Sequence, residues 1–256
     1  MPRHIVAACF NKSDITRRFL ESFRRNTRHK WELILVDNAS TDDTPQLLEA
    51  FRAQGLPLTV FRNAHNLGCA GAWNIGIREA LARGSHLVGV LNNDIVFGPD
   101  WDTGLLGYLE THPEEAIVGP HTMKCALDSF DERARHFALR NECRTRRKLV
   151  SEAMFLRAEV FTRVGLFDER FFLTFEDTDF YVRAVQAGIR PVVTGASVLW
   201  HKELTTRGAM PRDYEHKARE LFAQKWNGLE VLKTSGWERP RWKTRLWRWR
   251  ERFGIL

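Results

Sequence analysis

Short apolar runs alternate with amphipathic segments through the first third of the chain. The apolar runs have the length of strands and lie at 5–10, 31–36, 58–61 and 87–91. The segments between them repeat apolar residues every three or four positions, which predicts helices at 15–23, 45–54 and 70–82. Alternation of this kind predicts an α/β fold with a mainly parallel central sheet flanked by helices.

The pattern is weaker in the second half of the chain. Residues 119–147 are polar and basic, which predicts a surface loop region. Regular pattern then returns, and it predicts strands at 150–156, 191–194 and 197–201 and helices at 158–164 and 177–187. No internal repeat interrupts this order, so we expect one domain over residues 1–227.

Residues 228–256 form a basic, tryptophan-rich tail. Within it, Trp242, Leu246, Trp249 and Phe253 recur at helical spacing and form one narrow apolar stripe flanked by arginines. The stripe predicts an amphipathic helix over 240–253 that lies on an anionic membrane surface. The alternative is a helix docked on its own domain or on a partner chain.

Composition narrows the class of protein. The chain has 256 residues and a formal net charge of +7, which suits an anionic partner: nucleic acid, an anionic membrane or a phosphate-bearing substrate. The longest apolar runs are far shorter than the roughly 20 residues of a membrane span. The first apolar strand begins at residue 5, which leaves no room for a signal peptide. We therefore expect a cytoplasmic protein, peripheral on the inner face of the cell membrane.

Short polar residues follow three of the predicted strands. Asn11 follows the first strand, the run 37–42 the second, and the run 92–94 the fourth. In a parallel α/β sheet these carboxyl ends meet and form the ligand site. The chain has neither a glycine-rich dinucleotide motif nor a Walker sequence, so a metal or cationic side chains must balance the charge of a bound phosphate.

Two further features carry candidate chemistry. Asp94 and His201 both lie at strand ends, and their oxygen and nitrogen ligands suit Mn²⁺ or Mg²⁺ shared with phosphate oxygens. A structural histidine is the alternative for His201. Glu176 and Asp177 stand at the start of a predicted helix, where they can cap the helix or supply a general base.

Six segments of the chain have the residue types, and occur in the order, that are typical of one enzyme family. They are the run 36–42, Asn66-Leu67-Gly68 with Gly71 and Asn74, and the runs 91–94, 151–157, 165–169 and 175–179. With these segments the chain resembles the family 2 glycosyltransferases, which have the GT-A fold, from about residue 4 to residue 227. The runs 92–94 and 175–179 resemble most the bacterial rhamnosyltransferase-like branch, which builds surface polysaccharides.

The resemblance implies a role for each matching residue. The donor nucleotide is implied to contact Ala8, Asn11, Asp37, Asn66, Gly68, Asn93 and Asp94. Asp94 and His201 are implied to bind the metal, and Asp177 matches the catalytic base. Glu176 and a mobile loop are implied to lie near the diphosphate or the acceptor, the loop residues being Thr205, Thr206 and Arg207.

The implied reaction is an inverting transfer of a sugar from a UDP- or dTDP-linked donor to a glycan or lipid-linked acceptor. One departure stands out, because the acidic run of the family is here Asn92-Asn93-Asp94, with a single carboxylate. That change supports an alternative, a glycosyltransferase-like subunit with weak or lost activity. A nucleic-acid-binding protein is disfavoured because acidic strand ends repel phosphates, and a nucleotidyltransferase because the first loop lacks glycine.

Overall fold

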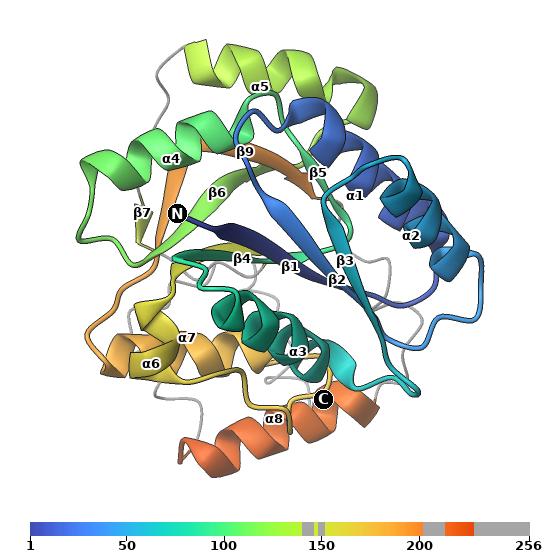
Figure 1. The fold of residues 1–256 in the computed structure, drawn as a ribbon. Coiled ribbons are helices and arrows are strands. Elements are labelled where there is room, and N and C mark those ends of the chain that lie inside the picture. Colours follow the sequence, from blue (N-terminus) through green and yellow to red (C-terminus); the bar gives the residue numbers. More distant parts are fainter. Residues whose placement is uncertain (140–145, 148–151, 202–212, 228–256) are drawn as a thin grey trace, which may run out of the picture.

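A sheet of nine strands runs through the middle of the molecule, with helices on both sides (Figure 1). The computed structural model describes residues 1–139, 146–147, 152–201 and 213–227. The sheet order is β3-β2-β1-β4-β8-β6-β9-β5, and β7 pairs with β9. The strands are β1 (Arg3–Cys9), β2 (Glu32–Asp37), β3 (Leu58–Arg62), β4 (Leu87–Asn92), β5 (Ile95–Phe97), β6 (Ile117–Met123), β7 (Arg146–Arg147), β8 (Ala153–Arg157) and β9 (Val192–His201).

Two layers of helices cover the sheet. The helices are α1 (Ser13–Asn26), α2 (Thr44–Ala53), α3 (Gly68–Ala82), α4 (Trp101–Thr111), α5 (Phe130–Leu139), α6 (Glu159–Val164), α7 (Glu176–Gln186) and α8 (Asp213–Lys225), with a short 3₁₀ turn η1 (Leu127–Ser129). Helices α1, α2 and α4 pack on one face, and α3, α6 and α7 on the other. Helix α8 packs against α7 and forms the lower edge of the molecule in Figure 1.

The predicted parallel sheet is present in the first half of the chain. β1 is parallel to β2 and β4, and β2 is parallel to β3. Each connection in this half carries a helix, which is what brings successive strands back in the same direction. The second half is mixed, because β8 runs antiparallel to both β4 and β6, and β5 and β7 run antiparallel to β9.

The predicted surface loop at 119–147 is wrong over its described part. It contains most of β6, the turn η1 and helix α5. Phe130 and Ala134 of α5 are buried against Val198 and Trp200 of β9. The basic residues of this helix lie on its exposed side and dominate its composition. The apolar residues that pack on β9 form only a narrow stripe, so the segment has the overall composition of a surface loop.

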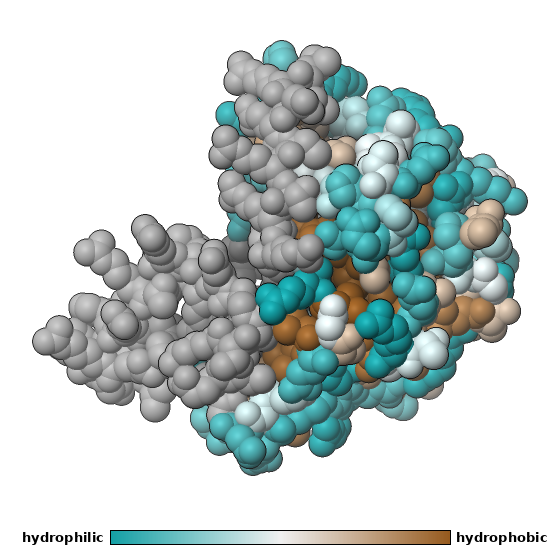
Figure 2. All heavy atoms as spheres, turned by 90° about the vertical axis from the view of Figure 1, so that its left-hand side faces the viewer, coloured by the Kyte–Doolittle hydropathy of each residue, from teal (hydrophilic) through white to brown (hydrophobic). Residues whose placement is uncertain are grey.

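The buried aromatic side chains lie between the sheet and the helices that cover it. The largest fully buried side chains include Trp31, Trp101 and Phe155, which pack around one another with ring centroids 5.4–5.7 Å apart. The surface turned toward the viewer in Figure 2 is mostly hydrophilic, with hydrophobic side chains gathered toward its middle. No described helix is long and apolar enough to cross a membrane. The tail 228–256 and the loop residues Thr205, Thr206 and Arg207 lie outside the described residues.

Candidate functional site

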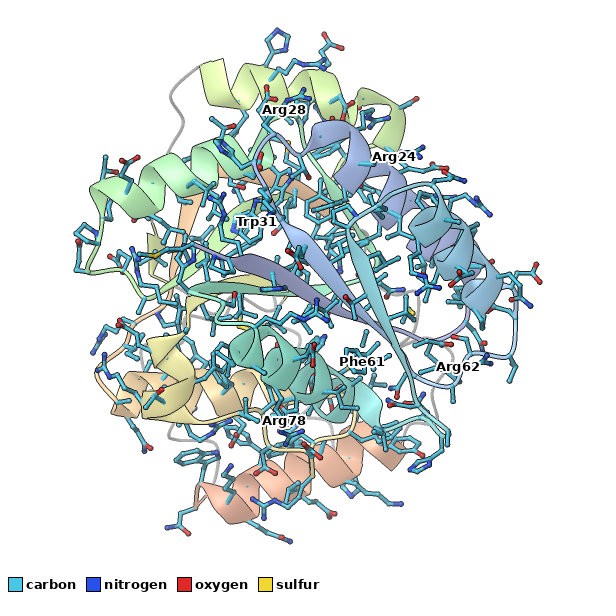
Figure 3. All side chains as sticks on the ribbon, in the orientation of Figure 1. Arg24, Arg28, Trp31, Phe61, Arg62 and Arg78 are labelled. Carbon is cyan, nitrogen blue, oxygen red and sulfur yellow. The ribbon has the colours of Figure 1, made fainter. Side chains whose placement is uncertain are left out.

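The predicted convergence of polar strand ends is present at the carboxyl edge of β1, β2 and β4. The strand register places Cys9 opposite Asp37 and Ala8 opposite Asn92. Asp37 in turn is opposite Arg62 at the end of β3, and Figure 3 labels Arg62 beside its neighbour Phe61. The sheet therefore brings together residues that are far apart in the sequence, at the edge where α/β proteins bind ligands.

The loops that leave β1 and β2 are tied together by short polar side chains. Asn11 has a left-handed backbone (φ 54°), and its Oδ1 accepts a hydrogen bond from the backbone N–H of Thr41 at 2.8 Å. The backbone N–H of Asn11 donates to Ser40 Oγ at 2.8 Å, and that of Ser13 donates to Asp42 Oδ2 at 3.0 Å. Asn11 thus shapes the edge of the site through contacts within the protein.

Asp37 is a buried carboxylate at the end of β2. Its side chain is 1% exposed, and Oδ1 accepts a hydrogen bond from the backbone N–H of Ser40 at 2.9 Å. Arg62 Nε lies 3.5 Å from Oδ2, which has no hydrogen-bond donor among the described residues. The residue therefore holds the turn after β2 and keeps one acceptor oxygen free of hydrogen bonds.

Asn38 joins the β2 and β3 ends of the site, and sequence reasoning missed it. Its Nδ2 donates to Asn66 Oδ1 at 2.7 Å and to the Gly68 carbonyl at 3.1 Å. Its Oδ1 accepts from Asn63 Nδ2 and from the backbone N–H of Leu67, both at 2.9 Å. The turn-forming composition of the run 37–42 is the only signal of this role in the sequence, because burial and hydrogen bonding of Asn38 appear only in the fold.

Gly68 begins α3 and touches the segment that leads to α7. Its backbone is left-handed (φ +74°), and a Cβ at this position would overlap the carbonyl oxygen of Phe172. The same carbonyl accepts a hydrogen bond from the backbone N–H of Cys69 at 2.8 Å. Asn66 Oδ1 accepts from the Gly68 N–H at 2.8 Å, which completes the turn. The predicted loop 66–68 is therefore anchored at both of its ends.

Asp94 and His201 meet, although 106 residues separate them in the sequence. Asp94 lies in the turn between β4 and β5, and β5 pairs with β9 so that Ile95 is opposite His201. His201 Nε2 is 3.2 Å from Asp94 Oδ1. Burial lowers the pKa of His201, but the hydrogen bond and charge of Asp94 outweigh burial, and the net pKa is raised. Asn93 turns away toward α1, donating to Thr16 Oγ1 at 2.9 Å.

The Asp94–His201 pair fits a divalent metal shared with a ligand. The 3.2 Å separation is an ordinary ion-pair distance, and a divalent ion bound to both atoms at about 2.1 Å and about 90° would keep them about 3 Å apart. His201 Nδ1 is buried without a hydrogen-bond partner among the described residues. The described part of the chain holds no group of three or more His, Cys, Asp and Glu side chains suited to a metal, so phosphate oxygens would have to complete the coordination.

Glu176 and Asp177 form the first turn of α7. The preceding residue, Phe175, has a left-handed backbone (φ 69°), so the chain turns sharply before the two acids. Asp177 is half-buried, and its Oδ1 accepts from the Thr178 backbone N–H at 2.6 Å and from Thr178 Oγ1 at 3.1 Å. Glu176 is buried. Acidic side chains in the first turn of a helix interact favourably with the helix dipole.

The fold and this edge of polar strand ends are those of a glycosyltransferase. Residues 4–171 match the family model described as Glycosyl transferase family 2, which is more than half of the chain. The chain therefore belongs to glycosyl transferase family 2. The predictions of the family and of glycosyl transfer are confirmed.

Curated relatives of known activity extend the match beyond residue 171. The N-acetylglucosaminyl-diphospho-decaprenol L-rhamnosyltransferase of Mycobacterium tuberculosis is 26% identical to this chain, over 94% of this chain and 88% of its own length. Galactofuranosyltransferase GlfT1 of Mycolicibacterium smegmatis is 28% identical, over 72% of this chain and 65% of its own length. The predicted likeness to rhamnosyltransferases is therefore borne out.

Solved structures confirm the fold. S. aureus TarS in complex with UDP-GlcNAc superposes with a TM-score of 0.64 at 16% identity, covering 90% of this chain and 68% of that chain. The mannosyltransferase PcManGT from Pyrobaculum calidifontis, in complex with GDP-Man and Mn²⁺, gives a TM-score of 0.60 at 18% identity, covering 80% and 58%. At these identities the likeness establishes the GT-A architecture.

Proposed function

We propose that this glycosyltransferase moves a sugar from a UDP- or dTDP-linked donor to an acceptor hydroxyl with inversion at the anomeric carbon. The observation that carries the proposal is the meeting of Asp94 and His201 at the strand-end edge that also holds Asp37. Asp37 Oδ2, a buried oxygen that no described donor hydrogen-bonds, is the proposed acceptor for the N3–H of a uracil or thymine base. The UDP-GlcNAc complex of TarS supports a nucleotide diphosphate donor on this fold.

Asp177 is the proposed general base. A carboxylate oxygen can accept the proton of a hydroxyl group as that group attacks. The acceptor oxygen would bond to the anomeric carbon as the bond from that carbon to the diphosphate breaks, and the diphosphate would leave with the electron pair. The acceptor proton would end on Asp177, whose orientation is set by Thr178.

Asp94 and His201 are the proposed holders of a divalent metal, together with donor phosphate oxygens. When bound, Mn²⁺ or Mg²⁺ supplies positive charge that stabilises the leaving diphosphate. The Mn²⁺ in the PcManGT complex supports this role. A single carboxylate and one imidazole form a small protein-side ligand set, so we expect the metal to bind tightly only after the donor is present.

The proposed acceptor is a lipid-linked glycan at the inner face of the membrane. The name of the mycobacterial rhamnosyltransferase describes an acceptor that joins a sugar to decaprenol through a diphosphate. The arginine-flanked stripe of Trp242, Leu246, Trp249 and Phe253 is suited to an anionic membrane surface. The full chain should sediment with vesicles that contain anionic lipid and remain in solution with neutral vesicles. Equal recovery with both would contradict the membrane role.

Asp177→Asn tests the base. We expect turnover to fall by about 10²–10⁴-fold, while donor binding, measured by thermal shift, stays intact. Asp128→Asn, an exposed acid on η1, is the matched control and should leave turnover unchanged. Near-normal turnover of Asp177→Asn with intact donor binding would remove Asp177 from the mechanism.

Asp94→Ala tests the metal. The wild-type protein should be stimulated by Mn²⁺ or Mg²⁺ and inhibited by a chelator, and the variant should lose both responses. Donor identity is tested separately by thermal shift with a panel of UDP- and dTDP-sugars, because a ligand that binds the folded state raises its melting temperature by mass action. Activity that is unchanged in chelator would rule out the metal role and leave the assignment of Asp177 standing.

A further inference from the structure

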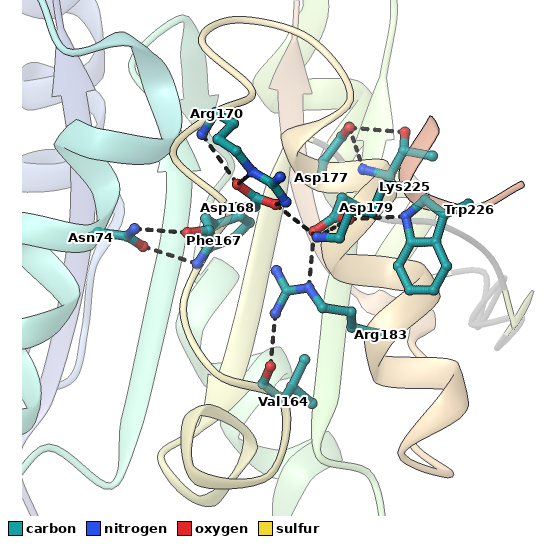
Figure 4. A network of polar contacts seen from close by, with 11 residues as sticks. Asn74, Val164, Phe167, Asp168, Arg170, Asp177, Asp179, Arg183, Lys225 and Trp226 are labelled. Carbon is teal, nitrogen blue, oxygen red and sulfur yellow. Dashed lines mark hydrogen bonds and ion pairs between the residues drawn. The ribbon is translucent and has the colours of Figure 1, made fainter. Parts of the chain in front are cut away.

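The end of helix α8 contacts the segment that leads into the proposed base. Residues 165–175 have no regular secondary structure, and they connect α6 to the first turn of α7. Lys225 Nζ, from the last turn of α8, lies 2.7 Å from Asp168 Oδ2 and 2.7 Å from Asp179 Oδ1. One ammonium group therefore joins the start of this segment to the first turn of α7 (Figure 4).

Asp179 is the buried centre of this network. Its side chain is 0% exposed, and its carboxylate receives Lys225 Nζ, Trp226 Nε1 at 3.0 Å and Arg183 Nε at 2.9 Å. Arg183 also donates to the Val164 carbonyl at 2.7 Å. A buried carboxylate of this kind is stable only while its donors are present, so the position of this turn depends on residues of α8.

Aromatic packing holds the same turn from a second side. Phe222 of α8 is fully buried and packs against Phe175, with ring centroids 5.1 Å apart and the ring planes tilted. Phe175 has the left-handed backbone that directs the chain into Glu176 and Asp177. Such a conformation is unfavourable for a non-glycine residue, and it persists where the surroundings fix it.

We propose that Lys225 and Trp226 are positioning residues for Asp177, and that α8 forms a clamp on the base-bearing turn. Asp177 is two residues before Asp179 in the same helical turn, so a shift of Asp179 moves the Asp177 carboxylate with it. Both positioning residues lie beyond residue 171, where the family match ends. The inference rests on the proposed function, because it gives Asp177 the role of base.

Lys225→Met in the full chain tests the clamp. We expect kcat to fall by about 10- to 100-fold, as misplacement of a reacting group by about 1 Å does. The KM for the donor should stay within about threefold, because the described ion pairs of Lys225 are with Asp168 and Asp179 and not with the strand-end edge, and kcat should be largely restored by Lys225→Arg. The assay measures nucleoside diphosphate release from UDP-GlcNAc and dTDP-L-rhamnose with a lipid-linked N-acetylglucosamine acceptor.

Lys217→Met is the matched control, since Lys217 is an exposed lysine on the same helix, and it should leave kcat unchanged. Trp226→Phe serves if Lys225→Met fails to fold, because it keeps an aromatic ring and removes the hydrogen bond to Asp179. Hydrogen exchange gives a readout independent of activity: amides of residues 176–180 should exchange faster in Lys225→Met and at the wild-type rate in Lys217→Met.

The outcomes separate the two proposals. An active wild type with unchanged kcat and unchanged exchange in Lys225→Met and Trp226→Phe would overturn the clamp alone. A loss of kcat that Lys225→Arg fails to restore, with exchange raised throughout the domain, would also overturn it, because general destabilisation would then explain the loss. A wild type that transfers no sugar from any donor of the panel would overturn the proposed function.

Discussion

The contact between Gly68 and Phe172 gives the sharpest test of how the site is built. Gly68→Ala places an L side chain at φ +74°, which costs about 1–2 kcal/mol. The new Cβ would also overlap the Phe172 carbonyl, a backbone group that is held in place by the Cys69 N–H at 2.8 Å. Overpacking against a group that cannot move adds about 1–3 kcal/mol. The free energy of unfolding should therefore fall by about 2–5 kcal/mol.

Gly84→Ala separates the two contributions to this loss. Gly84 has φ +72°, almost the same backbone, but a Cβ there meets no atom within 4 Å. Its substitution should cost only the backbone part, about 1–2 kcal/mol. Urea unfolding at constant pH measures the free energy of unfolding of both variants. In thermal unfolding, each kcal/mol of lost stability should lower the melting temperature by about 2–4 °C. If Gly68→Ala is no less stable than Gly84→Ala, the close approach to Phe172 does not exist in solution.

Two further predictions concern buried polar contacts. Asn38→Ala removes all four side-chain hydrogen bonds of the residue and leaves partners such as Asn66 and Asn63 without theirs. The free energy of unfolding, measured in urea, should therefore fall by about 2–3 kcal/mol. A loss below about 0.5 kcal/mol would contradict the conclusion that Asn38 joins the β2 and β3 ends of the site. The pKa of Asp168 is lowered, mainly by its hydrogen bond from Arg170 and also by Lys225. A depressed folded-state pKa stabilises the protein above the unfolded pKa, near 4, and this stability is lost as pH falls toward the folded value. The urea midpoint should therefore drop on acidification below about pH 4, and Asp168→Asn should drop less steeply; an identical slope in both proteins would refute this origin.

The first half of the fold was predictable because its signals are local. Strand and helix periods alternate from β1 to β4, and each predicted element is present with ends shifted by a few residues. The second half was harder because its strands pair out of chain order. β6 lies between β8 and β9, and no local pattern specifies that arrangement. Helix α5 was missed because basic residues on its exposed face dominate its composition.

The candidate site was likewise predictable where its contacts follow from local pattern, and not where they depend on strand pairing or tertiary packing. Polar residues that follow strands are visible in the sequence, and parallel register is enough to bring Asp37 beside the end of β1. The meeting of Asp94 with His201 depends on the antiparallel pairing of β5 with β9, which residue patterns alone did not predict. Ligand chemistry and the family resemblance both suggested a shared metal for these two residues, but neither predicted the direct contact between them. Lys225 was overlooked because its partners are 57 and 46 residues away and reach it only through tertiary packing.

The two sides of the site are held by different kinds of contact, and this difference sets how each should respond to change. The donor loop at 66–68 is fixed by neutral hydrogen bonds of the Asn38 side chain, each of which contributes about 0.5–1.5 kcal/mol. The base side is fixed by charges around the buried Asp179, where loss of one partner leaves the others uncompensated. Phe172 connects the two sides, because its carbonyl bonds to the start of α3 and its chain continues into Asp177. Weakening the α8 contact should therefore disturb the base first, and the donor loop only through Phe172.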